Sequence, residues 1–281
     1  MKNNLSESVR ARLLNIAKTE GSDFEQVLIR FALERLLYRI CQSQYAKQFL
    51  LKGAMLFSLW YDMPHRPTRD MDLLGFGDSE LAVMQHTFGD ICSIPYDDGI
   101  LFDSSTVEVE QIREESGYTG VRVIVRAELV KARCKVQIDI GFGDAVTPGP
   151  VQATYPVLLK DFSAPRLRTY PVYTIIAEKL HAISLLGMAN SRMKDYLDLQ
   201  VLFEREKLDE QLLVQAIAAT FTRRGMAVPV TLPVGLTDEF SNDIDKQTQW
   251  RAFLNRNQMA QRPLAEVVEI LRARFVAILK K

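Results

Sequence analysis

Two aspartates, Asp70 and Asp72, stand two positions apart in the sequence. On a β-strand, residues two apart point to the same side, so the two carboxylates would project together while Met71 and Leu73 face a core. Two negative charges this close favour a bound cation, and carboxylate oxygens suit Mg²⁺, which a carboxylate pair can share with substrate phosphates. An Asp-x-Asp sequence is also common at solvated strand ends, so the motif needs support from the elements around it.

The elements that would position this pair lie in residues 50–76. The pattern predicts a short strand ending at Lys52, a tight turn at Gly53-Ala54, a helix through Met63, and then the strand of the two aspartates. Glycine in the turn lets the backbone approach a ligand, and the unpaired N–H groups that open a helix suit a phosphate. This order of parts predicts a phosphate beside a metal.

A third carboxylate, Asp139, lies on a later predicted strand. Apolar and polar residues alternate over 121–128 and again over 135–140, which predicts two strands with one buried face. Asp139 stands between Ile138 and Ile140 and therefore points away from the buried face. From periodicity alone, the simplest interpretation is a solvated residue on the open face.

Together these residues resemble the nucleotidyltransferase superfamily of the DNA polymerase beta type, which is marked by a Gly-Gly or Gly-Ser turn, a helix and a strand with Asp-x-Asp. More narrowly, three motifs resemble the AbiEii/AbiGii toxin family, which includes the MenT tRNA-modifying toxins: Lys52-Gly53-Ala54, Arg66-Pro67-Thr68 and Asp70-Met71-Asp72. The resemblance implies that Asp139 is a metal ligand beside Asp70 and Asp72. Ala54 departs from the superfamily, because alanine offers no hydroxyl to a phosphate.

A lysine in the C-terminal part, Lys179, has an apolar setting. One face of a predicted helix within residues 173–202 carries Ile175, Lys179, Ile183 and Leu186. Such a lysine either extends to water or meets an anion. The resemblance implies that Lys179 serves the nucleotide phosphates.

The same segment continues with a charged stretch, Arg192-x-Lys194-Asp195-x-x-Asp198. Its two aspartates lie one helical turn apart, which alone fits a helix start, where acidic side chains are favourable. The resemblance implies that this stretch closes the nucleotide site. The predicted catalytic residues are Asp70, Asp72, Asp139, Lys179 and Asp195, and the predicted nucleotide-binding residues are Lys52, Gly53, Ala54, Arg66, Thr68, Lys179, Arg192, Lys194 and Asp198.

The chain has 281 residues with an ordinary hydrophobic fraction of 47%. Residues 1–48 have helical periodicity and would pack on a core of residues 49–165, and a proline-bounded connector at 165–171 leads into a helical domain over 166–281. Residues 51–165 carry 10 Lys or Arg and 17 Asp or Glu, a net charge of −7 that is compatible with a metal-dependent core. With the resemblance, the predicted fold class is α+β: a polymerase beta-type core, with a small mixed sheet and helices, followed by a helical C-terminal domain.

The three cysteines and three histidines lack the spacing of a zinc site or of a disulfide framework. Charges interrupt the apolar runs well before the length of a membrane span, and residues 1–15 lack the apolar core of a signal peptide. We therefore expect a cytoplasmic protein with no membrane partner.

The resemblance implies a nucleotidyltransferase that uses a nucleoside triphosphate with Mg²⁺ or Mn²⁺ and is the toxin of an AbiE-type (type IV) toxin–antitoxin system. It also implies an RNA acceptor, the 3′ end of tRNA, and a cognate AbiEi-like antitoxin. Three alternatives stay open: a nucleotidyltransferase acting on a small molecule such as an antibiotic or on a protein hydroxyl, a phosphotransferase that moves the γ phosphate, and a nucleotide-binding regulator without turnover. Ala54 suggests the regulator, and the intact carboxylates argue against it.

Overall fold

The computed structural model describes residues 2–61, 66–113 and 119–279. In this part of the chain a seven-stranded mixed sheet combines with α-helices, which confirms the predicted α+β class. The fold divides into two compact units, Met1–Gly143 with Val151–Thr169, and Asp144–Pro150 with Tyr170–Lys281. The sheet belongs to the first unit.

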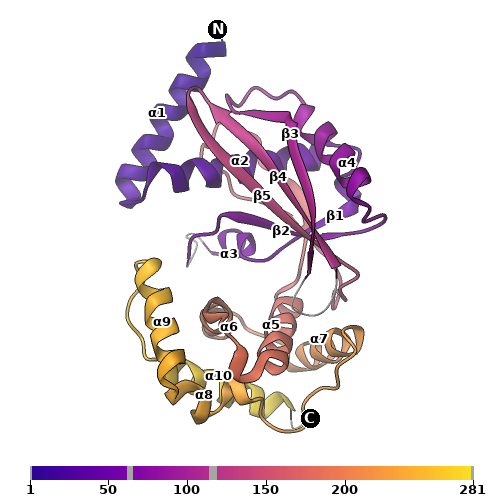
Figure 1. Ribbon diagram of the computed structural model, residues 1–281, viewed down its shortest axis with the longest axis vertical. Coiled ribbons are helices and arrows are strands. Elements are labelled where there is room, and N and C mark those ends of the chain that lie inside the picture. The colour runs from indigo at the N-terminus through magenta and orange to yellow at the C-terminus, as the bar shows by residue number, and fades with distance from the viewer. Residues whose placement is uncertain (1, 62–65, 114–118, 280–281) are drawn as a thin grey trace. The chain divides into compact units, whose positions relative to one another are not determined.

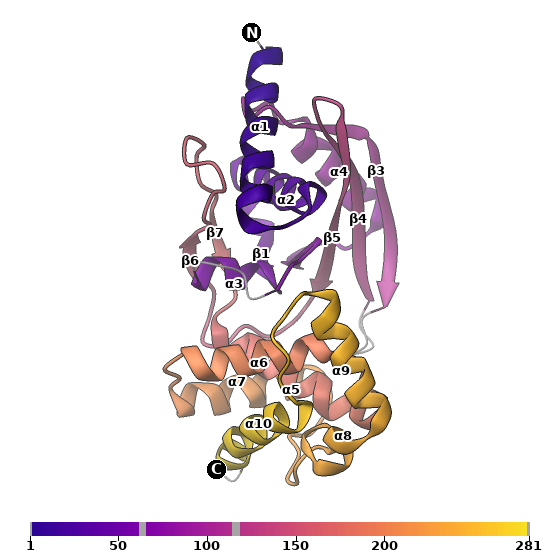
Figure 2. The same cartoon turned by 90° about the vertical axis from the view of Figure 1, so that its left-hand side faces the viewer.

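The sheet has the strand order β3-β4-β5-β2-β1-β7-β6, with β1 to β5 labelled in Figure 1 and β6 and β7 labelled in Figure 2. Its strands are β1 Phe49–Lys52, β2 Asp70–Gly75, β3 Leu101–Arg113, β4 Thr119–Leu129, β5 Ala132–Phe142, β6 Val151–Thr154 and β7 Arg166–Thr169. At the centre, β2 runs parallel to β5 and antiparallel to β1. The strand of Asp70 and Asp72 is therefore the neighbour of the strand of Asp139.

Helices pack on the apolar side of this sheet. The α-helices described in the first unit are α1 Lys2–Glu20, α2 Phe24–Gln42, α3 Met55–Trp60 and α4 Leu81–Ser93. Helix α2 packs against β5, and α4 packs against β3 and β4. Val123 and Val125 on β4 are fully buried, whereas Arg122 and Arg126, which alternate with them, reach solvent. Burial of one side of each strand thus leaves the other side for polar groups.

In the part that the structure describes, the second unit consists of helices with the loops that join them, together with the segment Asp144–Pro150 (Figure 2). Its described α-helices are α5 Val172–Leu186, α6 Met193–Arg205, α7 Glu210–Arg223, α8 Asp238–Asn242, α9 Ile244–Arg256 and α10 Leu264–Leu279. Helix α5 packs against α7, and α10 packs against α6. The segment 144–150 is attached to α5 through Thr147, whose N–H donates to Thr174 Oγ1 and whose carbonyl accepts from the same hydroxyl.

Residues Val172–Ala189 are long and apolar enough, by composition, to span a membrane. In the structure they form α5 and a short 3₁₀ turn, and α5 buries Ile176 and Leu180 completely within the second unit. The same helix carries the charge of Lys179. We therefore interpret it as a core helix of this unit, and the cytoplasmic location stays a prediction.

The prediction of a connector over residues 165–171 is wrong, because Arg166–Thr169 forms β7, which pairs antiparallel with β6 and parallel with β1. A run of four strand residues between two prolines is too short for periodicity to reveal it. The second unit resumes after this strand, at Tyr170. The helix predicted to run through Met63 ends at Trp60, and Met63 lies outside the described residues.

Candidate functional site

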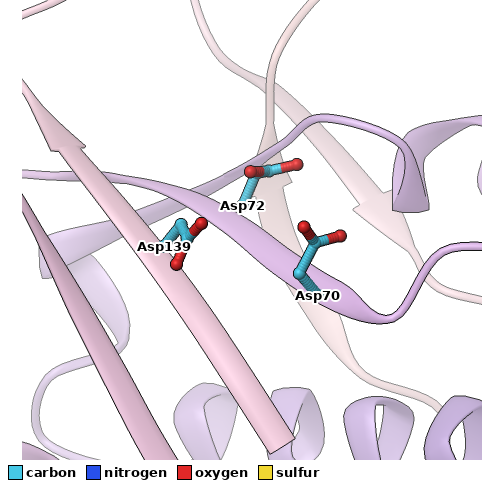
Figure 3. Close-up of side chains that lie close together, drawn as sticks. All are labelled: Asp70, Asp72 and Asp139. Carbon is cyan, nitrogen blue, oxygen red and sulfur yellow. The ribbon is translucent and has the colours of Figure 1, made fainter. Parts of the chain in front are cut away.

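The carboxylates of Asp70, Asp72 and Asp139 gather where β2 and β5 lie side by side (Figure 3). One oxygen atom from each residue lies within 4.8 Å of the oxygen atoms of the other two. Asp72 and Asp139 are register partners in the parallel strand pair. All three side chains are half-buried, so solvent reaches them. Three oxygen donors in this arrangement, with no nitrogen or sulfur ligand among them, suit a hard divalent cation such as Mg²⁺ or Mn²⁺.

Apolar residues on the opposite face of the two strands fix this arrangement. Met71 and Leu73 on β2 and Ile138 and Ile140 on β5 are each at most 1% exposed. A slip of one residue in either strand would expose these side chains and turn the carboxylates toward the core. The hydrophobic pattern therefore places the carboxylates on the open face of the sheet.

Asp139 is held by a residue that the sequence analysis did not single out. Arg122, its register partner on β4, donates from Nε and Nη2 to the two carboxylate oxygens, each at 2.8 Å. This hydrogen bonding raises the pKa of Arg122 above its ordinary value, so the guanidinium stays charged. The alternation in β4 already indicated that Arg122 faces outward, but only the register between β4 and β5 shows that it faces Asp139.

Asp70 is held by Thr68, which belongs to the segment that leads into β2. The Thr68 hydroxyl donates to Asp70 Oδ1 at 2.7 Å. Thr68 is one of the predicted nucleotide-binding residues, and its contact in the structure is with a candidate metal ligand. Arg66, two residues earlier, is half-buried.

Gly53 lies against the side chain of Asp72. Its φ of +72° is one that residues with a side chain rarely adopt. A Cβ atom on Gly53 would lie 1.9 Å from Asp72 Oδ2 and 2.7 Å from Asp72 Cβ. Lys52, the residue before it, is the register partner of Asp72, and both Lys52 and Ala54 are buried. The carboxylate itself therefore requires glycine in the turn, independently of any phosphate.

In the second unit, Lys179 on α5 lies between two carboxylates of α6. Its Nζ is 2.7 Å from Asp195 Oδ1 and 2.7 Å from Asp198 Oδ2. Arg192 Nε donates to the other oxygen of Asp195 at 2.6 Å. Burial raises the pKa of Asp195, but the positive charges of Lys179 and Arg192 outweigh burial and hold that pKa below its ordinary value. The carboxylates that pair with Lys179 thus belong to the same unit. The side chains of Lys179, Arg192, Asp195 and Asp198 together carry no net charge.

The predicted site residues therefore fall into two groups, one in each unit. The first unit holds Lys52, Gly53, Ala54, Arg66, Thr68, Asp70, Asp72 and Asp139, and the second unit holds Lys179, Arg192, Lys194, Asp195 and Asp198. In the second group, Lys194 is exposed on α6, and Arg192 has a side chain that is 34% exposed. These are the two cations of the second group that solvent reaches most readily.

Comparison with known proteins gives one family match. Residues 35–280 match the family described as "Nucleotidyl transferase AbiEii toxin, Type IV TA system". No curated protein matches the chain. A solved structure of a proposed nucleotidyltransferase from Helicobacter pylori is 17% identical, with a TM-score of 0.50, over 89% of this chain and 92% of that chain. The H. pylori protein JHP933 is 14% identical, with a TM-score of 0.41, over 89% of this chain and 96% of that chain. At these identities, the first of the two supports the fold alone.

Proposed function

The chain belongs to the AbiEii family of nucleotidyl transferase toxins of type IV toxin–antitoxin systems, and on this premise we propose that it transfers a nucleoside monophosphate from a nucleoside triphosphate to RNA. The 3′ end of tRNA is the acceptor that we propose. Type IV membership also supports a cognate antitoxin, for which an AbiEi-like protein is our proposal.

The observation that carries the proposal is the group of three carboxylates on adjacent strands. Asp70, Asp72 and Asp139 place three oxygen donors within 4.8 Å of one another on a face that solvent reaches. This donor set fits Mg²⁺ or Mn²⁺ better than a soft metal. A divalent cation bound there would offset the charge of the triphosphate and of the leaving pyrophosphate.

The reaction is a displacement at the α phosphorus. A hydroxyl oxygen of the acceptor forms a bond to that phosphorus, the bond from the phosphorus to the α–β bridging oxygen breaks, and pyrophosphate leaves with the electron pair. In the proposal Asp139 accepts the hydroxyl proton, with Arg122 and Gln137 as the hydrogen-bond donors that orient its carboxylate. Arg122 would keep Asp139 oriented toward the acceptor throughout.

Cations and backbone groups would meet the phosphates. In the first unit we propose Lys52, Arg66 and the turn at Gly53-Ala54 for this role. In the second unit we propose Lys194, which is exposed, and Arg192, which is partly exposed, as phosphate contacts. Lys179 already has two carboxylate partners, so we propose that Lys179, with Asp195 and Asp198, chiefly holds Arg192 in place.

One labelling experiment tests the proposal. The protein is incubated with Mg²⁺ and each of the four nucleoside triphosphates, labelled at either the α or the γ phosphate, together with cellular RNA or cellular protein. We expect α label on RNA and no transfer of γ label. Asp70→Asn should abolish this labelling, and Asp97→Asn, a change at an exposed loop aspartate, should leave it intact. Label on protein would indicate that the acceptor is a protein hydroxyl instead of RNA. Transfer of γ label would indicate a phosphotransferase. Nucleotide binding without any transfer would indicate a regulator.

A further inference from the structure

A cavity of about 150 Å³ opens in the first unit beside the carboxylate cluster. Helices α2 and α3, the segment that leads into β2 and the segment that follows β6 all contribute to its walls. None of the three carboxylates lines it, so it is a separate space from the metal site.

Two residues nevertheless connect the cavity to the carboxylates. Thr68 lines the cavity, and its hydroxyl donates to Asp70 at 2.7 Å. Ala54 also lines it and directly follows Gly53, which lies against Asp72. A molecule whose phosphates are bound at the carboxylates can therefore extend another of its groups into the cavity.

The walls combine apolar side chains with polar and charged ones, which include Arg30 and Glu34 on α2. Leu33 on α2 and Met55 on α3 contribute buried aliphatic side chains. Ser58 and Tyr155 contribute hydroxyls, and burial raises the pKa of Tyr155 to about 12, so its phenol stays protonated. Arg66 adds a planar guanidinium of the kind that stacks on aromatic rings. A pocket with both apolar surface and convergent hydrogen-bonding groups suits a ligand group that is itself part apolar and part polar, such as a heteroaromatic ring.

Buried contacts keep this cavity open. Glu34, which is 2% exposed, accepts the N–H of Leu158 at 2.7 Å through Oε2, and its Oε1 lies 2.8 Å from Arg35 Nη2. These contacts fix the segment after β6 against α2. A cavity that is already formed requires less ordering when a ligand enters it.

We propose that this cavity receives the base of the incoming nucleotide and that its size favours a pyrimidine. The inference rests on the proposed function, because it requires nucleotide phosphates at the carboxylates. In another protein, an apolar cavity of about 150 Å³ binds one benzene molecule, so the volume here matches a single six-membered ring. The second ring of a purine would have to stay outside the cavity or displace a wall.

The test is the binding of CTP, UTP, ATP and GTP with Mg²⁺, measured by calorimetry in the absence of an acceptor. We expect the pyrimidine nucleotides to bind the wild-type protein about tenfold more tightly than the purine nucleotides, as for a pocket that selects by size. Two filling variants, Ser58→Leu on α3 and Val157→Phe in the segment after β6, should each remove this preference. Inorganic tripolyphosphate should bind the variants and the wild type equally well, because the phosphate contacts are unchanged.

The control is Ser93→Leu, the same substitution at an exposed helical serine that does not line the cavity, and it should keep the preference. Melting curves identify a variant that fails to fold, and the second filling variant then takes its place. Equal or tighter binding of purine nucleotides, or a preference that survives both filling variants, would overturn the inference. A filling variant that raises the KM for acceptor RNA without changing nucleotide binding would also overturn the inference, because it would indicate that the cavity binds the acceptor and not the nucleotide base. Because the calorimetric binding measurements need no turnover, their outcome is independent of whether α label is transferred to RNA.

Discussion

Replacing Gly53 by alanine tests how the carboxylates are positioned. The new Cβ would lie 1.9 Å from Asp72 Oδ2 and 2.7 Å from Asp72 Cβ, and Cβ contacts below 3.0 Å are essentially never seen. Rotation of the Asp72 side chain moves Oδ2 but leaves Cβ in place, so β1 and β2 must separate or Asp72 must leave its position. Gly53→Ala should therefore displace one of the three candidate metal ligands.

Gly21 supplies a matched control for the backbone cost of this substitution. Its φ of +64° is close to that of Gly53, and a Cβ there would have nothing within 4 Å. Gly21→Ala should cost about 1–2 kcal/mol of folding free energy for the left-handed backbone. Gly53→Ala should cost this amount and a further 1–3 kcal/mol, roughly, for overpacking.

The assays are thermal unfolding, Mn²⁺ titration by calorimetry and transfer of α label to RNA, all on folded protein. Gly53→Ala should lower transfer by about 100-fold, since a shift of about 1 Å in a reacting group has that effect, and should weaken Mn²⁺ binding. Gly21→Ala should change neither. Wild-type transfer and Mn²⁺ affinity in Gly53→Ala would refute the argument that glycine is needed for Asp72.

Three further predictions concern other charged groups. Asp139→Asn should still bind Mg-nucleotide in calorimetry but transfer no α label to RNA, because the amide cannot take a proton from the acceptor. Lys179→Met should lower the free energy of unfolding by about 3–5 kcal/mol, read from denaturant titration, because it leaves Asp195 and Asp198 buried without their shared cation. Burial lowers the pKa of His181, a residue of α5 that is 2% exposed, from 6.5 to about 4. The stability that neutral His181 contributes should therefore be complete above pH 6.5 and be lost as pH falls toward 4, by roughly 3 kcal/mol, and His181→Leu should abolish this loss in melting curves recorded across that range.

The contacts of Lys179 show what helical periodicity can and cannot predict. Its place in an apolar helical stripe indicated a lysine that either reaches water or meets an anion. If that anion were a nucleotide phosphate, a methionine variant would keep its stability. The structure instead puts two buried aspartates of α6 around the ammonium group, and this changes the expected result of the substitution. Which helices pack together is a tertiary fact that no single periodic segment contains.

The sheet shows the same limit of prediction from sequence periodicity. The strands of the aspartates were predictable because alternation over β2, β4 and β5 marks a buried and an open face. The pairing of Arg122 with Asp139 was not, because the register between two strands depends on partners far away in the sequence. Strand β7, with four residues, is too short to show alternation at all.

The three carboxylates differ in how each is fixed, and the difference bears on metal binding. Thr68 holds one by a hydrogen bond, Arg122 holds another by two, and Gly53 leaves space for the third. These residues come from three separate segments, so the ligands are placed by the fold before any cation arrives. The fold therefore holds three negatively charged groups close together although they repel one another, and a bound cation would relieve this repulsion. The metal affinity of this site should therefore be set largely by residues that do not themselves ligate the metal.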